Sequence, residues 1–362
     1  MALSNYRITT IVILILLTLY IFYTIKYKPR AIIPTIGEKT VESFTVPDEA
    51  INEFDALASK YVEYTTIQGV PDKYTDRPLH EYCIKSSYNS ACSGKYVSTA
   101  MVKHVLQRGC RFLDFEVFYI KDSNLFIPKV AVSSDSNYIL LDSKNSIPLD
   151  EVLSTISTSA FSQTSPNAND PVFINLRIKS RDTEVYNEVS KSIAATLKSV
   201  AYSGDITKDT KLKDIMRKAI VVIDKTIQPD YKEYSTCKTD DTNCYDISNF
   251  THLESGSEYL NKYHYTDILN QCNKPVMVKD DNIHTTAENM KMAVPDAITS
   301  LDNPANPAMK EFIIKHGCQN VFYQYQTVDQ NLKQCEKFFN SVKAGILPLS
   351  STLSYYSQSN IE

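Results

Sequence analysis

The hydrophobic positions of this 362-residue chain follow two different patterns. Ile8 to Ile25 (ITTIVILILLTLYIFYTI) is an uninterrupted uncharged run, long enough to span roughly 27 Å as a helix at 1.5 Å per residue. Further along, short apolar runs rich in branched and aromatic residues alternate with segments of helical period. That alternation predicts a parallel sheet with crossover helices, and an α/β barrel fits it best.

The expected elements can be placed by residue number. The strands are expected at Tyr82–Ser86, Arg111–Ile120, Pro171–Lys179, Ala219–Lys225, Val276–Lys279 and Val321–Thr327. The helices are expected at Val97–Arg108, Leu149–Phe161, Thr183–Val200, Leu212–Lys218, Asn306–His316 and Asp329–Val342. A polar stretch, Gln228–Thr251, interrupts the alternation and divides the barrel into two halves. A polar spacer over residues 31–65, with a weak helical pattern near Asp48–Tyr61, predicts a stalk.

The apolar run near the start is interpreted as an uncleaved membrane anchor. It is followed by Lys26, Lys28 and Arg30, and no small-residue cleavage site is present. A cleaved signal peptide or a buried helix is the alternative. The basic flank is larger on the C-terminal side, so the charge rule predicts a single-pass protein with its C-terminal domain on the cytosolic side.

Composition excludes several classes of function. A formal net charge of -4 gives no basic surplus for a phosphate backbone, so no nucleic-acid partner is expected. The 8 glycines form neither GxGxxG nor GxxxxGK[ST], which excludes the two common nucleotide-binding loops. The 8 cysteines do not resemble a small secreted disulfide scaffold. Cys237 and Cys244 are the best candidates for one disulfide.

Six segments carry a family resemblance. They are RPLHEYCIKSSYNSACSG from Arg77, GCRFLDFEVF from Gly109, PVFINLRIKS from Pro171, IVVIDK from Ile220, HGCQNVFYQYQT from His316 and FFNSVKAGILPLS from Phe338. In order and spacing they resemble the X and Y halves of phosphoinositide-specific phospholipase C. The resemblance implies a distorted TIM-type barrel, here preceded by one transmembrane helix. The expected division is 1–30 anchor, 31–65 stalk, 66–227 X-like half, 228–251 linker, 252–350 Y-like half and 351–362 tail.

The residues that the family uses for catalysis are replaced here. The resemblance implies two histidines as general base and acid, and a calcium ion held by an asparagine and three carboxylates. Tyr88 stands at the first histidine, and no histidine occurs between His104 and His252, where the second is expected. The unperturbed pKa of tyrosine, about 10, makes it a poor base at neutral pH. All six histidines are expected on flanks or helices.

The calcium site that the resemblance implies is only partly kept. Asn89, Asp114 and Glu116 match three of its ligands, and Arg177 stands at the fourth, in Leu-Arg-Ile-Lys. We expect the Arg177 guanidinium to form a salt bridge with both carboxylates and to take the place of the ion. The alternatives are a residual calcium site, which is the one case in which a cofactor is expected, and an Arg177 that points to solvent.

The phosphate-binding residues of the family are also depleted. Lys225 matches the second of two lysines, and Ile223 stands at the first. Met292 and Val294 stand where an arginine and a tyrosine are expected. Lys225 is therefore the candidate phosphate ligand that remains.

Three functions are compatible with these residues. The favoured one is a membrane-anchored, catalytically inactive barrel that serves as a structural protein with a protein partner or assembly. Lysine-, asparagine- and tyrosine-rich usage suggests an AT-rich genome, and in a virus such a barrel would tether a virion membrane to a capsid layer. The second is an active phosphodiesterase with Tyr88 or Lys179 as substitute base. The third is a phosphoinositide sensor without turnover.

Overall fold

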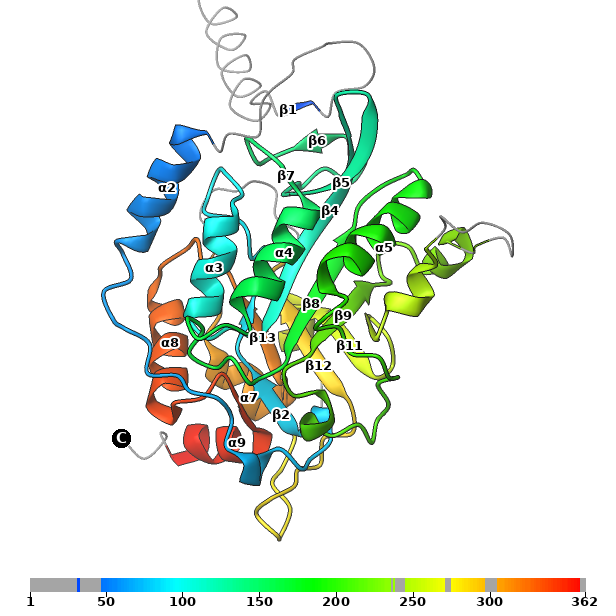
Figure 1. Ribbon diagram of the computed structural model, residues 1–362. Coiled ribbons are helices and arrows are strands. Elements are labelled where there is room, and N and C mark those ends of the chain that lie inside the picture. The colour runs from blue at the N-terminus through cyan, green and yellow to red at the C-terminus, as the bar shows by residue number, and fades with distance from the viewer. Residues whose placement is uncertain are drawn as a thin grey trace, which may run out of the picture.

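Eight parallel strands close into a barrel at the centre of the computed structural model (Figure 1). The structure describes residues 31–32, 47–235, 237, 245–270, 275–296 and 305–358. Around the barrel the strand order is β3 (Ser86–Ser87), β4 (Phe112–Asp122), β8 (Val172–Ile178), β9 (Ala219–Asp224), β10 (Leu253–Ser255), β11 (Leu260–His264), β12 (Met290–Val294) and β13 (Asn320–Tyr323). Pairing of β13 with β3, and of β3 with β4, closes the ring.

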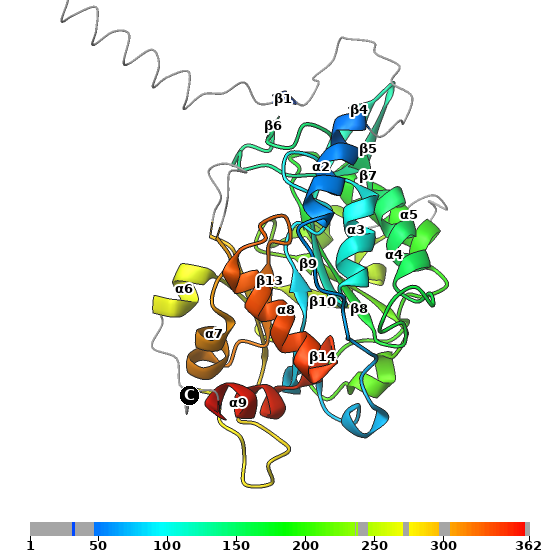
Figure 2. The ribbon, with the colours of Figure 1, turned by 90° about the vertical axis from the view of Figure 1, so that its left-hand side faces the viewer.

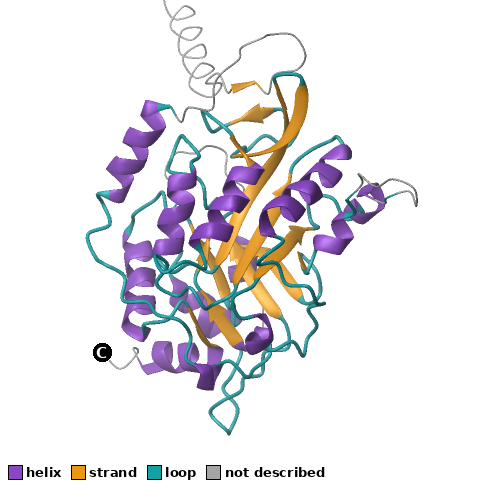
Figure 3. Cartoon of the chain, in the orientation of Figure 1, coloured by secondary structure: helices purple, strands orange, loops and turns teal. Residues whose placement is uncertain are grey.

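Helices lie outside the strands, as Figure 3 shows. They are α2 (Asp48–Ala58), α3 (Thr99–Gln107), α4 (Leu149–Ser159), α5 (Glu184–Leu197), α6 (Tyr265–Asn270), α7 (Met309–His316), α8 (Gln330–Val342) and α9 (Leu349–Gln358). The remaining strands are β1 (Ala31–Ile32), β2 (Tyr82–Ile84), β5 (Leu125–Ala131), β6 (Leu140–Leu141), β7 (Ile147–Pro148) and β14 (Ile346–Pro348). Strand β5 pairs antiparallel with β4, and β14 pairs antiparallel with β2.

Strand alternation separates two cores. Along β4, Leu113, Phe115 and Val117 face the helix layer, because successive side chains of a strand point to opposite faces. The alternate residues face the barrel interior, where the rings of Phe112, Phe173 and Phe322 pack with centroids 5.2 and 4.9 Å apart. These rings fill the middle of the barrel.

Most of the expected elements are present, but those of the second half of the barrel differ most. Residues 276–279, expected as a strand, lie in a loop with an isolated bridge between Val278 and Thr285. The strand of that region is β12, and β10 and β11 were not expected either. Leu212–Ile215 forms a short 3₁₀ helix instead of a longer α-helix. Strands β10 and β11 were missed because they are short and carry polar residues such as Ser255 and Lys262 at inward-facing positions, so the usual apolar alternation is missing.

The segment expected as a stalk is partly docked on the barrel. Helix α2 buries Ala50 and Leu57, and the carboxylate of Glu53 accepts hydrogen bonds from the backbone N–H groups of Lys95 and Tyr96. From residue 47 onward this segment therefore belongs to the folded body (Figure 2).

The polar linker also packs on the body. Tyr231 and Ile247 are buried, and the ring of Tyr231 lies 5.9 Å from that of Tyr186 on α5. Cys237 is disulfide-bonded, whereas Cys244 lies outside the described residues. The predicted anchor, Ile8 to Ile25, also lies outside them. Within the residues that are described, no helix has the length and apolar character needed to cross a bilayer.

Candidate active site

The carboxyl ends of the barrel strands carry a cluster of buried charges, which we call the mouth cluster: Asp114, Glu116, Arg177, Lys179, Asp224 and Lys262. Asp114 and Glu116 lie on β4, two and four residues after inward-facing Phe112, so they face the barrel interior as Phe112 does. Strand β8 pairs with β4 in register, so that Glu116 is directly opposite Arg177. Parallel pairing thus brings residues about sixty positions apart in the chain to the same level of the barrel.

Arg177 lies between the two β4 carboxylates. Its Nε and Nη2 donate to Asp114 at 2.9 and 2.7 Å, and its Nη1 donates to Glu116 at 2.8 Å. Nη2 also donates to the Oδ1 of Asn89 at 2.5 Å. The side chain is 5% exposed, and its guanidinium lies 4.3 Å from the ring centre of Tyr88. Each nitrogen of the guanidinium therefore has an oxygen partner, and one face is covered by an aromatic ring.

Every oxygen of the two carboxylates is engaged by a donor. Oδ1 of Asp114 also accepts from Asn175, and Oδ2 accepts from the backbone N–H of Asn89. The second oxygen of Glu116 accepts from the N–H of Ser133 at 2.8 Å and lies 3.1 Å from the ammonium of Lys179. Two cations thus balance two anions. The oxygens that would hold a calcium ion are taken up by nitrogen donors, so the residues present do not fit that ion.

The protonation states follow from this pairing. Burial disfavours the charged form of Glu116, but the charges of Lys179 and Arg177 outweigh burial and lower the pKa of Glu116. Burial likewise opposes the charge on Arg177, yet Asp114 and Glu116 hold the pKa of its guanidinium well above the ordinary value. Burial raises the pKa of Tyr88 and lowers that of Lys179. Glu116 and Arg177 are therefore held in their charged forms at pH 7, and Tyr88 is held in its neutral form.

Asn89 has a left-handed backbone, with φ at 44°. Asparagine tolerates this conformation better than most residues do. In this conformation the backbone N–H of Asn89 donates to Asp114, while its side-chain oxygen accepts from Arg177.

A second ion pair lies in the mouth and was not predicted. The ammonium of Lys262 is 2.5 Å from Oδ2 of Asp224, and Thr226 donates to Oδ1 of the same carboxylate at 2.6 Å. Asp224 is 2% exposed. Asp224 could have been found from the sequence, because it lies at the end of an expected strand. Lys262 could not, because it lies on β11, which the sequence pattern did not indicate.

The structure places Lys225, the candidate phosphate ligand, in the turn directly after β9, where its charge helps to lower the pKa of Glu254. The expectation for His264 is wrong. His264 does not lie on a flank or helix: it ends β11 with the same parity as Lys262, and its Nδ1 is 2.8 Å from the carbonyl of Pro295.

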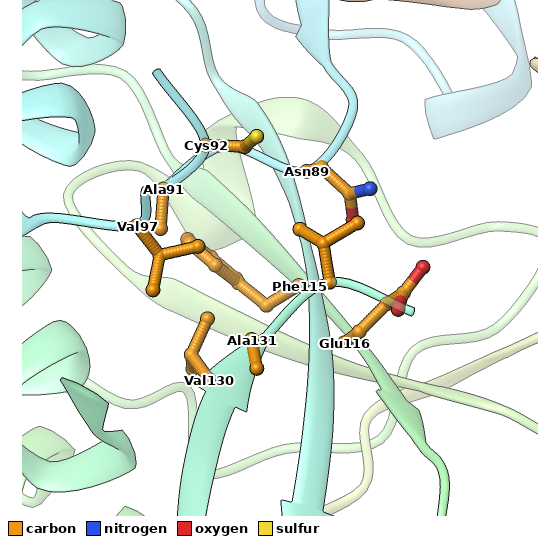
Figure 4. A pocket seen from close by; sticks show the side chains of 9 residues that line it. Asn89, Ala91, Cys92, Val97, Phe115, Glu116, Val130 and Ala131 are labelled. Atoms are coloured by element: carbon orange, nitrogen blue, oxygen red, sulfur yellow. The ribbon is translucent and has the colours of Figure 1, made fainter. Parts of the chain in front are cut away.

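Behind Asn89 and Glu116 lies a narrow apolar pocket that has no room for a water molecule. Figure 4 shows the apolar side chains of Ala91, Val97 and Val130 gathered on one side, with the polar ends of Asn89 and Glu116 turned away from them. The mouth cluster is therefore closed on this side by hydrocarbon, which excludes solvent from its ion pairs.

Comparison with known proteins shows which known fold the barrel resembles. Residues 75–225 match the model of the X domain of phosphatidylinositol-specific phospholipase C. The barrel has the phospholipase C fold. The crystal structures of PLC21 from L. pealei and S. officinalis align with 91% of this chain, with TM-scores of 0.55 and 0.56 and 12% and 14% identity. A calcium-dependent phosphoinositol-specific phospholipase C from Pseudomonas sp. aligns over 79% of this chain and 100% of its own, with TM-score 0.47 and 12% identity.

This chain spans about half of each of the two PLC21 structures, of which 47% is covered. None of the curated protein sequences matches it. The similarity to phospholipase C thus concerns the barrel fold, and the X-domain match ends at Lys225, next to Asp224 of the mouth cluster.

Proposed function

We propose that this protein is a membrane-anchored, phospholipase C-like barrel that does not hydrolyse phosphodiesters and serves as a structural body with a protein partner. The observation that carries the proposal is the position of Arg177. Its guanidinium engages Asp114, Glu116 and Asn89 together, the three residues that match ligands of the family's calcium ion. A cation built into the chain cannot leave to admit a metal or a substrate hydroxyl.

The acid–base chemistry supports the same proposal. Hydrolysis of a phosphodiester at neutral pH needs a group that accepts a proton and another that supplies one. Tyr88 is held protonated by burial, and its ring covers the guanidinium of Arg177. Lys179 is engaged by Glu116 and by the carbonyl of Ser133, at 3.1 and 2.8 Å. Neither of these two side chains is therefore available to accept a proton from a substrate.

The test uses the purified full chain with vesicles that contain phosphatidylinositol. Release of inositol phosphate is measured with calcium and then with a chelator, and an active phospholipase C on the same vesicles is the positive control. We expect no release above the protein-free background, and a melting temperature that calcium does not change. Calcium-dependent release would contradict the proposal.

A hydrolase that works without metal is the second candidate, and His264 is the observation that favours it. The histidine faces the barrel mouth, and a proton on Nδ1 that bonds to the Pro295 carbonyl leaves Nε2 as an acceptor. Chelator-resistant release that is lost in His264→Gln but kept in His284→Gln would establish this candidate. His284 is a matched control because it lies in an exposed loop, paired with Asp281.

A further inference from the structure

The linker between the two halves of the barrel contains the one Asn-x-Ser/Thr tripeptide of the chain, Asn249-Phe250-Thr251. Oligosaccharyltransferases of the secretory pathway attach glycans to the asparagine of this tripeptide when x is not proline. The tripeptide also occurs by chance, so its meaning depends on two further observations. These are the exposure of the asparagine and the redox chemistry of the linker.

The structure presents Asn249 on the surface of a short turn that is fixed to the barrel. Asn249 is exposed in the 3₁₀ helix Ile247–Phe250, and its side-chain amide has no hydrogen-bond partner within the part of the chain that the structure describes. Ile247 is buried, Phe250 packs against the main core, and the hydroxyl of Thr251 donates to the carbonyl of Ile247 at 2.9 Å. A glycan on Asn249 therefore extends into solvent and displaces no contact of the folded barrel.

The described cysteines differ in redox state according to where they lie. Five of them are buried free thiols: Cys83, Cys92, Cys110, Cys318 and Cys335. Burial raises the pKa of Cys92, Cys110 and Cys318 to about 12, so these thiols stay protonated and unreactive. Cys237, half-buried in the polar linker, is disulfide-bonded. Oxidation is therefore found in the linker, and the buried thiols of the barrel are protected from it.

A disulfide in a polar surface segment indicates the compartment in which a chain folds. In the cytosol such a bond is reduced by glutathione and thioredoxin, whereas in the lumen of the endoplasmic reticulum and outside the cell it persists. Cys237 and Asn249 lie in the same linker, which Figure 1 shows in yellow-green beside α5. The bond and the tripeptide are independent observations, and both are typical of chains that fold in the secretory pathway.

We propose that Asn249 is an N-glycosylation site and that the barrel lies on the lumenal side of its membrane. This inference rests on the anchored barrel of the proposed function. It departs from the charge rule, which predicts the cytosolic side from Lys26, Lys28 and Arg30. That rule counts only the charges beside the apolar run, whereas the linker reports on the compartment in which the barrel itself folds.

The modification is a transfer of an oligosaccharide from a lipid-linked donor. The Nδ2 atom of Asn249 forms a bond to the anomeric carbon of the first sugar and releases one proton. The bond between that carbon and the diphosphate of the donor breaks, and the lipid diphosphate leaves with the electron pair.

The test is cell-free translation of the full chain with and without microsomal membranes, followed by electrophoresis before and after treatment with a peptide N-glycosidase. We expect one shift to lower mobility that requires the membranes and is reversed by the glycosidase. Asn249→Gln and Thr251→Ala should abolish the shift, whereas Thr251→Ser, which keeps the hydroxyl, should retain it. The shift is scored on the denatured chain, so it does not depend on the stability of a variant.

A second acceptor site separates the compartment from the choice of asparagine. His284→Thr gives the sequence Asn282-Ile283-Thr in an exposed loop of the second half of the barrel. In the chain that combines Asn249→Gln with His284→Thr, a shift reports the lumenal side even if Asn249 is not used. Carbonate extraction of the same microsomes shows whether the chain is anchored in the membrane.

The outcomes separate this inference from the proposed function. A chain that resists extraction and carries a glycan at Asn249 supports both. A chain that resists extraction but is modified in neither the parent nor the double variant lies on the cytosolic side, which overturns this inference alone. Modification of the double variant without modification of the parent would refute Asn249 as the site. A modified chain that carbonate extracts would overturn the anchor and leave the glycosylation site standing, and an extracted, unmodified chain would overturn both.

Discussion

Removal of the Arg177 guanidinium is the sharpest test of the mouth cluster. In Arg177→Met the aliphatic stem is kept, but Asp114 and Glu116, 0% and 3% exposed, lose their shared partner. Lys179 still balances one of the two charges, so one buried carboxylate is left unpaired. Breaking a buried ion pair in this way costs about 3–5 kcal/mol. For a chain of this size, that cost corresponds to a fall in Tm on the order of 10 °C.

Urea or thermal unfolding, followed by circular dichroism, measures the change. The matched control is Arg181→Met, since Arg181 is exposed and bonds only to Asn137 among the contacts described, and its loss should stay within about 0.5 kcal/mol. The double variant Arg177→Met with Asp114→Asn should regain part of the stability, because Glu116 is then left with Lys179. A loss below about 1 kcal/mol in Arg177→Met would refute the claim that the guanidinium compensates both carboxylates.

The pH dependence of the same variant provides a second criterion. Without the guanidinium, the folded pKa of the unpaired carboxylate rises above its unfolded value. The destabilisation is therefore complete above the folded pKa, shrinks as the pH falls through it, and is gone below the unfolded pKa. We therefore expect Arg177→Met to lie closer to the parent chain in Tm at pH 4 than at pH 7. An equal difference at both pH values would point to lost packing rather than lost charge compensation.

Three further outcomes are expected. Lys262→Met should lower the free energy of unfolding by about 3 kcal/mol in urea, since it leaves buried Asp224 without its lysine partner. The control is Lys225→Met, which should change stability little. Lys225 is next to Asp224 in the sequence but is not part of the mouth cluster. His104 lies between two aromatic rings, and its pKa is lowered to about 4, chiefly by burial. The stability of the folded chain should therefore fall as the pH drops from about 6.5 toward 4. His104→Phe should flatten this slope of Tm against pH. The folded pKa of Glu116 is lowered, so its contribution to the free energy of unfolding is present above the unfolded pKa of about 4.3 and is lost as the pH falls through the folded pKa. On acidification Glu116→Gln should therefore lose less stability than the parent chain in unfolding curves.

Elements whose pattern is local could be predicted from the sequence alone. Strands β4, β8 and β9 are long apolar runs, and helices α3, α4, α5 and α8 show a helical period, so each was visible within its own residues. The chemical identity of the site was also local: Asn89, Tyr88 and Arg177 could be read against a family pattern one residue at a time. A guanidinium at a position matched to a carboxylate predicted a charge partner without any coordinates.

Features that depend on residues far apart in the chain could not be predicted in this way and came from the fold. Strands β10 and β11 exist because the barrel must close between β9 and β12, and their own residues are too few and too polar to signal a strand. The Lys262–Asp224 pair depends on that closure, since it joins residues 38 positions apart. The exposure of side chains and the pairing of strands and charges are properties of the assembled barrel. A sequence pattern reports only which side chains of one segment can be buried together.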